Sequence, residues 1–184
     1  MTANDVALSQ RVGAMYVAAC EEIFAAYGVG IQLHEPLTDS LGQGTASYVS
    51  LIGEDGHDFS LTLVLISDDA LLAASYPAIL TPEMAIDLQD WCRELSNQLG
   101  GRLTQKLFAC GCEVTLGLAK LITVEGLSRI HDPDADVHSF WFTSTRGSVL
   151  ARLSMRFAPD FQLAAVAASP DGMSMYYDGA QILF

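Results

Sequence analysis

Basic residues are scarce in this chain of 184 residues. Nine Lys and Arg stand against 22 Asp and Glu, which gives a formal net charge of −13. A surface this acidic repels phosphate backbones and anionic lipid headgroups. We therefore expect no nucleic-acid partner and no membrane-surface binding.

Long apolar runs are also missing. Segments such as Leu61–Ile66 and Leu163–Ala168 are far shorter than the roughly 20 residues that cross a bilayer. The N-terminal segment MTANDVALSQ has no basic stretch followed by an apolar one, the pattern of a secretory signal. Hydrophobic residues still make up 51% of the chain and charged residues 17%, which excludes an intrinsically disordered protein. The sequence predicts a soluble, cytoplasmic, acidic globular protein.

Cysteine is sparse and shows no metal-binding spacing. Cys20 and Cys92 fall on apolar helical patterns, where a thiol behaves as a small hydrophobe. Cys110 and Cys112 form a C-x-C without a second Cys or His pair at zinc-finger spacing. We expect structural thiols in a reducing compartment, without a disulfide framework.

Several familiar motifs are absent. The chain contains neither a G-x-x-x-x-G-K-[ST] phosphate loop nor a G-x-S-x-G nucleophile elbow. The acidic segment 131–138 starts like a calcium loop, but Val137 and Thr143 occupy the positions that require Gly and Glu. His131 and His138 beside its aspartates could hold a metal; a solvated acidic loop between two strands is the interpretation that we favour. We predict no metal site.

Two segments carry apolar residues at helical spacing. The first is Asp5–Tyr27, followed by Gly28 and Gly30, which suit a helix end. The second runs from Pro82 to Leu107, with Thr81 as a plausible N-cap and Pro at the first helical position. In the second segment Leu95, Leu99 and Leu103 share one face, so we expect that face to be buried.

The remaining pattern is that of strands and turns. A short helix is predicted at Asp68–Ser75, before Pro77. Strands are predicted at Tyr48–Ile52, Phe59–Ile66, Glu113–Leu116, Lys120–Val124, Val137–Ser144 and Ser148–Phe157. Because tight turns join successive strands, the sheet should be antiparallel. The predicted fold class is α+β: a single domain in which two long helices pack on one face of an antiparallel β-sheet.

The polar side of the second helix holds the most informative residues. Glu94 and Asn97 are i,i+3 neighbours on the helix surface. Gly101 lies one turn further along the line through this pair, and Asp90 lies on the same line. A solvated polar face is the simpler interpretation. However, the adjacent glycines 100 and 101 each cost a helix about 1 kcal/mol relative to Ala, and a purely solvated face has no reason to accept that cost. A binding or catalytic face is the alternative.

This helix resembles the signature helix of the CheX/CheC/FliY family of chemotaxis proteins. The family pattern E-x-x-N-x-x-x-G is present here as Glu94, Asn97 and Gly101, and Gly111 and Gly126 follow around the next strands. The resemblance extends over roughly residues 5–157. The chain departs from it in having Arg102 where many members have Asn, and in lacking a Pro in the strand that follows. The signature occurs once, as in CheX-type proteins.

The resemblance implies a phosphatase that removes the aspartyl phosphate of a CheY-like receiver domain. In that scheme Asn97 orients the attacking water and Glu94 contacts the receiver lysine, while Asp90 and Gly101 contribute to receiver docking. The receiver supplies Mg²⁺, so this chain would carry no cofactor of its own. Together with the apolar strands and an apolar C-terminus, the resemblance also implies a homodimer.

Two other functions stay open at this stage. The same fold occurs in flagellar-switch components, so a non-catalytic receiver-binding or interaction module is the main alternative. A stand-alone small-molecule hydrolase is less well supported, because the sequence offers no nucleophile–base pair.

The C-terminal residues lie outside the resemblance. We expect a CheX-like domain over residues 1–157 and a C-terminal extension, residues 158–184, that packs on the same domain. A self-association surface is the alternative for the extension.

Overall fold

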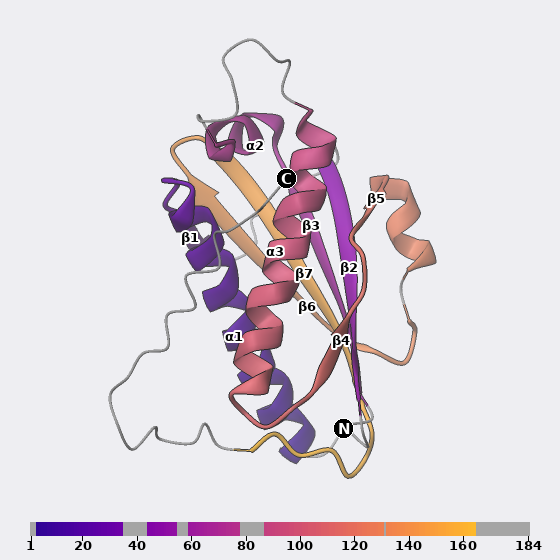
Figure 1. Ribbon diagram of the computed structural model, residues 1–184. Coiled ribbons are helices and arrows are strands. Elements are labelled where there is room, and N and C mark those ends of the chain that lie inside the picture. Colours follow the sequence, from indigo (N-terminus) through magenta and orange to yellow (C-terminus); the bar gives the residue numbers. More distant parts are fainter. Residues whose placement is uncertain (1–2, 35–43, 55–58, 78–86, 131, 165–184) are drawn as a thin grey trace, which may run out of the picture.

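The computed structural model describes residues 3–34, 44–54, 59–77, 87–130 and 132–164 (Figure 1). Its helices are α1 (Ala3–Ala26), α2 (Asp69–Ser75), α3 (Leu88–Phe108) and the 3₁₀-helix η1 (Val124–Arg129). Its strands are β1 (Gln32–His34), β2 (Thr45–Gly53), β3 (Phe59–Ser67), β4 (Val114–Leu116), β5 (Lys120–Ile122), β6 (Asp136–Ser144) and β7 (Gly147–Phe157).

The strands form one antiparallel sheet. Their order is β1-β6-β7-β3-β2-β4, and β5 also pairs with β2. The long central strands β3 and β7 pair along their whole length, from Phe59 opposite Phe157 to Ser67 opposite Val149. The successive strands β2 and β3, and likewise β6 and β7, pair antiparallel, as the tight turns between them predicted.

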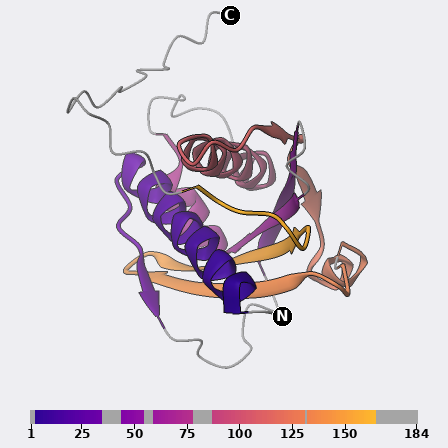
Figure 2. The ribbon, with the colours of Figure 1, turned by 90° about the horizontal axis from the view of Figure 1, so that it is seen from below.

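Both long helices lie on the same face of the sheet (Figures 1 and 2). Helix α1 buries Val12, Tyr16, Ala19 and Ile23, which recur at intervals of three and four residues. These side chains share one core with α3 and with the inward-facing residues of the sheet. The predicted fold class, α+β with two long helices packed on one face of an antiparallel sheet, is confirmed.

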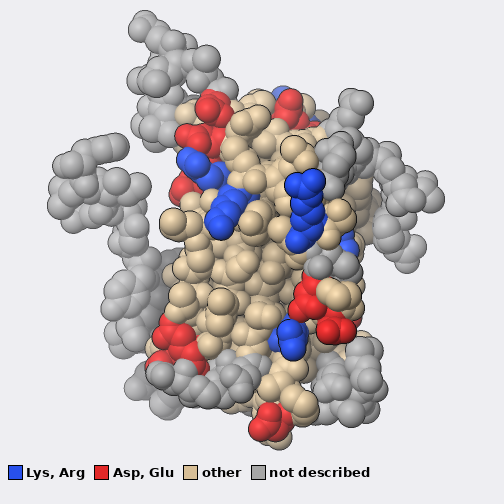
Figure 3. All heavy atoms as spheres, turned by 90° about the vertical axis from the view of Figure 1, so that its right-hand side faces the viewer, with Lys and Arg blue, Asp and Glu red and all other residues tan. Residues whose placement is uncertain are grey.

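On the opposite face of the sheet, the described residues form a smaller apolar cluster that covers part of it. This cluster combines Ala46, Val64, Ile66 and Trp141 with residues of η1, including Leu127. Figure 3 shows the side of the molecule on which β2 and β5 lie, where uncharged side chains cover most of the surface between separate basic and acidic groups.

No helix in the described part of the chain is long and apolar enough to cross a membrane.

Two element boundaries differ from the prediction for a local structural reason, and one strand was not predicted. Helix α3 begins at Leu88 and not at Pro82, because the backbone of Asp87 is extended and its side chain caps the helix; residues 78–86, which include Thr81, are outside the described ranges. Strand β5 ends at Ile122 and not at Val124, because the Thr123 hydroxyl accepts a hydrogen bond from the Gly126 amide and starts η1. The three-residue strand β1 was not predicted.

The described start of the C-terminal extension contacts α1. Phe161 and Leu163 are buried, and the guanidinium of Arg11 donates to the carbonyl oxygens of Leu163 and Ala164 at 2.8 and 2.7 Å. Residues 165–184 are outside the described part, so the division of the chain at residue 157 stays a prediction.

Candidate functional site on helix α3

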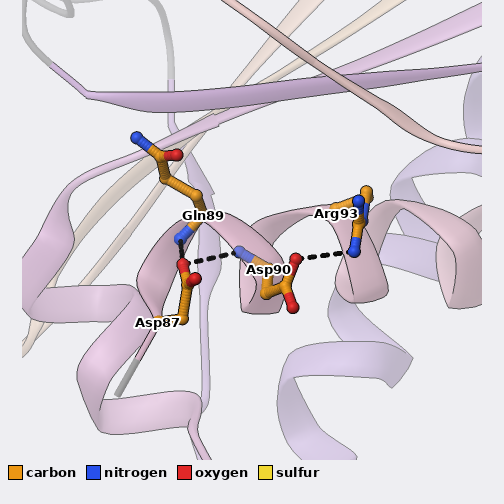
Figure 4. A network of polar contacts seen from close by, with 4 residues as sticks. All are labelled: Asp87, Gln89, Asp90 and Arg93. Carbon is orange, nitrogen blue, oxygen red and sulfur yellow. Dashed lines mark hydrogen bonds and ion pairs between the residues drawn. The ribbon is translucent and has the colours of Figure 1, made fainter. Parts of the chain in front are cut away.

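Helix α3 starts at a side-chain cap. The carboxylate of Asp87 accepts hydrogen bonds from the backbone amides of Gln89 and Asp90, both at 3.0 Å (Figure 4). Amides in the first turn of a helix have no partner within it, so this cap satisfies two donors and fixes where the helix begins.

Asp90 lies in the first turn of α3. Its carboxylate forms an ion pair with Arg93 at 2.6 Å (Figure 4). The two side chains are 62% and 46% exposed, so the pair adds little to stability but lies available to a partner. Sequence reasoning selected Asp90 and missed Arg93, although the i,i+3 spacing of opposite charges was a signal for it.

The face of α3 that packs on the sheet is apolar, with a few polar contacts to β2. Leu95, Leu99 and Leu103 are buried, as predicted. Beside them the buried Ser96 hydroxyl forms a hydrogen bond with the hydroxyl of Ser47 on β2. Because a misplaced hydroxyl in the core is costly, this contact fixes the rotation of α3 and thereby the direction of its outer face.

Glu94 is exposed on that outer face. Its Oε1 accepts a hydrogen bond from Nε2 of Gln98 at 2.8 Å. Oε1 of Gln98 in turn accepts from the hydroxyl of Tyr27 at 2.7 Å, directly after α1. The carboxylate is therefore held at one oxygen, and sequence reasoning did not identify either residue that holds it.

Asn97 is half-buried, one helical turn after Glu94. Its Oδ1 accepts a hydrogen bond from the backbone amide of Ala119 at 2.9 Å. A backbone N–H can only donate, so this contact decides which atom of the carboxamide is oxygen and which is nitrogen. Among the described residues Nδ2 has no hydrogen-bond partner. The structure thus places the predicted pair on one face of α3, with Glu94 more open to solvent than Asn97.

The two adjacent glycines of α3 have different surroundings. A Cβ at Gly100 would lie 2.6 Å from Cδ1 of Leu116 and 3.3 Å from Cγ1 of Val49, so Gly100 lets the helix pack closely on β2 and β4. A Cβ at Gly101 would meet nothing within 4 Å. Packing therefore accounts for Gly100, whereas Gly101 leaves open space next to the predicted pair.

The histidines, cysteines and acidic residues are the other candidates for a metal site or a nucleophile. Within the described ranges, no group of three or more His, Cys, Asp and Glu could hold a metal ion. His138 instead contacts the carboxylate of Asp136 at 2.9 Å; His131 is outside those ranges. All four cysteines are free and buried, and burial raises the pKa of Cys92 to about 11, which makes this thiol a poor nucleophile.

No family model and no curated protein matches this chain. Its similarity to known proteins is found in solved structures, and these include CheX and CheC-like chemotaxis proteins.

The chemotaxis protein CheX from Vibrio vulnificus superposes with a TM-score of 0.62 at 11% identity, over 79% of this chain and 96% of that one. A chain of the CheX–CheY–BeF₃–Mg²⁺ complex from Borrelia burgdorferi gives a TM-score of 0.58 at 14% identity, over 78% of this chain and 96% of that one. The FliM–SpeE complex from H. pylori contains a chain with a TM-score of 0.55 at 10% identity, over 84% of this chain and 89% of that one. At these identities the likeness establishes the fold, which is that of CheX and CheC-like proteins.

Proposed function

We propose that this protein binds a phosphorylated CheY-like receiver domain and hydrolyses its aspartyl phosphate. The observation that carries the proposal is the outer face of α3, where an exposed carboxylate, Glu94, and a half-buried carboxamide, Asn97, lie one turn apart. The side chains of both are held by hydrogen bonds, and the fold is one that also occurs in a CheX–CheY complex.

The reaction requires no covalent bond between the substrate and this protein. A water molecule attacks phosphorus, the bond from phosphorus to the aspartyl oxygen breaks, and inorganic phosphate and the free carboxylate are released. The transition state of such a transfer is loose, so positioning the water in line matters more than a strong base. A carboxamide suits this role because it can accept a hydrogen bond from the water and donate one to a phosphoryl oxygen. Asn97 is the residue that we assign to it.

Glu94 is assigned to recognition. A carboxylate on a helix surface pairs well with a lysine of the receiver, and a charge-assisted contact fixes the register of the two proteins. Asp90 and the open space at Gly101 extend the same face, so we include both in the docking surface. In this scheme the receiver holds the Mg²⁺ that stabilises the phosphoryl oxygens, and this chain contributes no cofactor.

The test is a time course of phosphate loss from a panel of phosphorylated receiver domains, with wild-type and Asn97→Ala protein side by side. We expect the wild-type protein to accelerate loss from at least one receiver and Asn97→Ala to lower kcat about 100-fold, as misplacing a reacting group does. Gln105→Ala is the matched control, since Gln105 is an exposed amide on the same helix. A fully active Asn97→Ala protein would refute the mechanism.

Glu94→Ala separates recognition from chemistry. Removing the carboxylate should raise KM more than it lowers kcat, because the lost ion pair lies between the two proteins. Glu94→Gln keeps the contact to Gln98 but removes the charge, so it should raise KM as well. A fall in kcat alone would contradict the role assigned to Glu94.

A non-catalytic interaction module is the second candidate. The likeness to a chain of the FliM–SpeE complex favours it, because a shared fold does not determine catalysis. The same experiment distinguishes the two functions: a wild-type protein that binds a phosphorylated receiver without accelerating its hydrolysis is an adaptor.

A further inference from the structure

The edge of the sheet nearest Asn97 contains a β-bulge. Strands β4 and β5 both pair with β2, and between them residues 117–119 stand opposite residues 49–50 of β2. One edge therefore has an extra residue, which disturbs the ladder and leaves a backbone group without its usual partner. Here the amide of Ala119 donates to Oδ1 of Asn97 on α3. The bulge thus directs a main-chain donor at the candidate catalytic side chain.

The position of this bulge is closely constrained. The amide of Gly117 donates to the carbonyl oxygen of Ser50 at 2.8 Å. A Cβ at Gly117 would lie 3.1 Å from that same oxygen, a tighter contact than usual, so glycine lets the chain lie close to β2 at this point. Ala119 is 7% exposed, so its amide is largely shielded from water. The bulge is therefore held on β2 at Gly117 by a contact that does not involve α3.

The hydrogen bond leaves the carboxamide partly free. A carbonyl oxygen has two lone pairs, and Ala119 uses one of them. The second lone pair and the two Nδ2 protons remain for a ligand. A free Asn side chain could also present its amide reversed, with nitrogen where the oxygen should be. The fixed donor excludes that orientation.

We infer that the Ala119 amide is a positioning group for Asn97, and that the 117–119 bulge exists to hold the carboxamide in the orientation that receives water and phosphoryl oxygen. This inference rests on the proposed function, since it assigns the reason for the orientation to catalysis. Ala119 acts through Asn97 and does not itself touch the substrate.

Amide hydrogen exchange tests the contact without any activity assay. In the wild-type protein the Ala119 amide should exchange slowly. Asn97→Ala should accelerate its exchange about tenfold, the effect of losing one hydrogen bond. Asn97→Asp keeps an acceptor oxygen and should preserve slow exchange, yet it lacks the Nδ2 donor and should be inactive. Exchange that is equally fast in wild-type and Asn97→Ala protein would overturn the inference.

Gly117→Ala tests positioning without touching Asn97. The added methyl must push residue 117 away from Ser50 by a few tenths of an ångström and shift the Ala119 amide with it. We expect kcat to fall roughly fivefold with KM unchanged, because small misplacements of a reacting group are costly. Gly30→Ala is the matched control, since a Cβ there meets nothing within 4 Å. Both variants should be confirmed as folded by circular dichroism.

The outcomes separate the two claims. If the wild-type protein is active and Gly117→Ala, though folded, keeps the full kcat, the positioning role is overturned and the proposed function stands. If the wild-type protein hydrolyses no receiver phosphate, the proposed function fails and the positioning role fails with it. A lower kcat in Gly117→Ala together with faster Ala119 exchange supports the inference.

Discussion

The hydroxyl of Tyr27 donates a hydrogen bond to Oε1 of Gln98 at 2.7 Å and so connects the end of α1 to the outer face of α3. Tyr27 is itself held by an edge-to-face contact with Trp91, with ring centroids 4.8 Å apart. Nε2 of Gln98 in turn donates a hydrogen bond to the carboxylate of Glu94. The candidate recognition carboxylate is therefore connected by side chains to the packed interior. Ordering Glu94 before binding lowers the entropy lost when a partner docks.

Gln98→Ala should release Glu94 from this arrangement. We expect KM for the phosphorylated receiver to rise roughly threefold, the effect of having to order one long side chain on binding, with kcat unchanged. Gln105→Ala, which removes an exposed amide from the same helix, should leave KM unchanged. Steady-state kinetics of both variants measures this effect. Equal KM values for Gln98→Ala and Gln105→Ala would contradict the proposed ordering of Glu94 by Gln98.

Sequence periodicity predicted the fold well where burial determines it. Leu95, Leu99 and Leu103 recur every four residues, and they are buried together. The start of α3 was wrong by six residues because helix propensity and an N-terminal proline favoured Pro82, whereas the side chain of Asp87 supplies the observed cap. Several residues along such a stretch can cap a helix with similar energies, so the residue at which the helix begins is hard to predict.

The site was predicted only in part, for a physical reason. The spacing of Glu94 and Asn97 is a local property of one helix, so the sequence can show it. The partner of Asn97 is not local: Ala119 reaches it through a bulge that depends on the register of β4 and β5 on β2. A one-residue change in strand register cannot be read from a short apolar segment.

Acid should weaken the contact between α1 and β6. Burial raises the pKa of Asp136, but hydrogen bonds from Ser9 and His138 and the charge of His138 outweigh it, so the pKa lies below its ordinary value. A carboxylate with a lowered pKa stabilises the fold above its unfolded pKa of about 4, and this contribution is lost as the pH falls further. Asp136→Asn should therefore lower Tm at pH 6, and this loss should become smaller as the pH falls below about 4.

Thermal unfolding at both pH values measures this effect. The matched control is Asp134→Asn, two residues away at an exposed position. If Asp136→Asn and the wild-type protein differ by the same amount at pH 6 and pH 3, the carboxylate does not contribute as described.

The edge formed by β2, β4 and β5 should take part in self-association. Large apolar side chains are exposed there: Ile52, Leu116, Leu118 and Leu121. Exposed apolar edges of sheets are commonly paired or covered. We expect a homodimer in sedimentation velocity at micromolar concentration and a shift towards monomer for Leu118→Asp, a change at a position that is 83% exposed. A wild-type monomer at that concentration would exclude the dimer.

The two glycines of α3 should respond differently to the same substitution. Gly101→Ala adds a methyl group that meets nothing, so the gain in helix propensity should raise the free energy of unfolding by about 1 kcal/mol. Gly100→Ala has the same gain in helix propensity, but its methyl group forces Leu116 to rotate and the buried Val49 to shift. We therefore expect no net increase in its free energy of unfolding. Urea unfolding of the two variants measures the difference directly. If a partner approaches α3 closely at Gly101, the stabilised Gly101→Ala protein should also bind the receiver more weakly, and equal affinity would remove Gly101 from the docking surface.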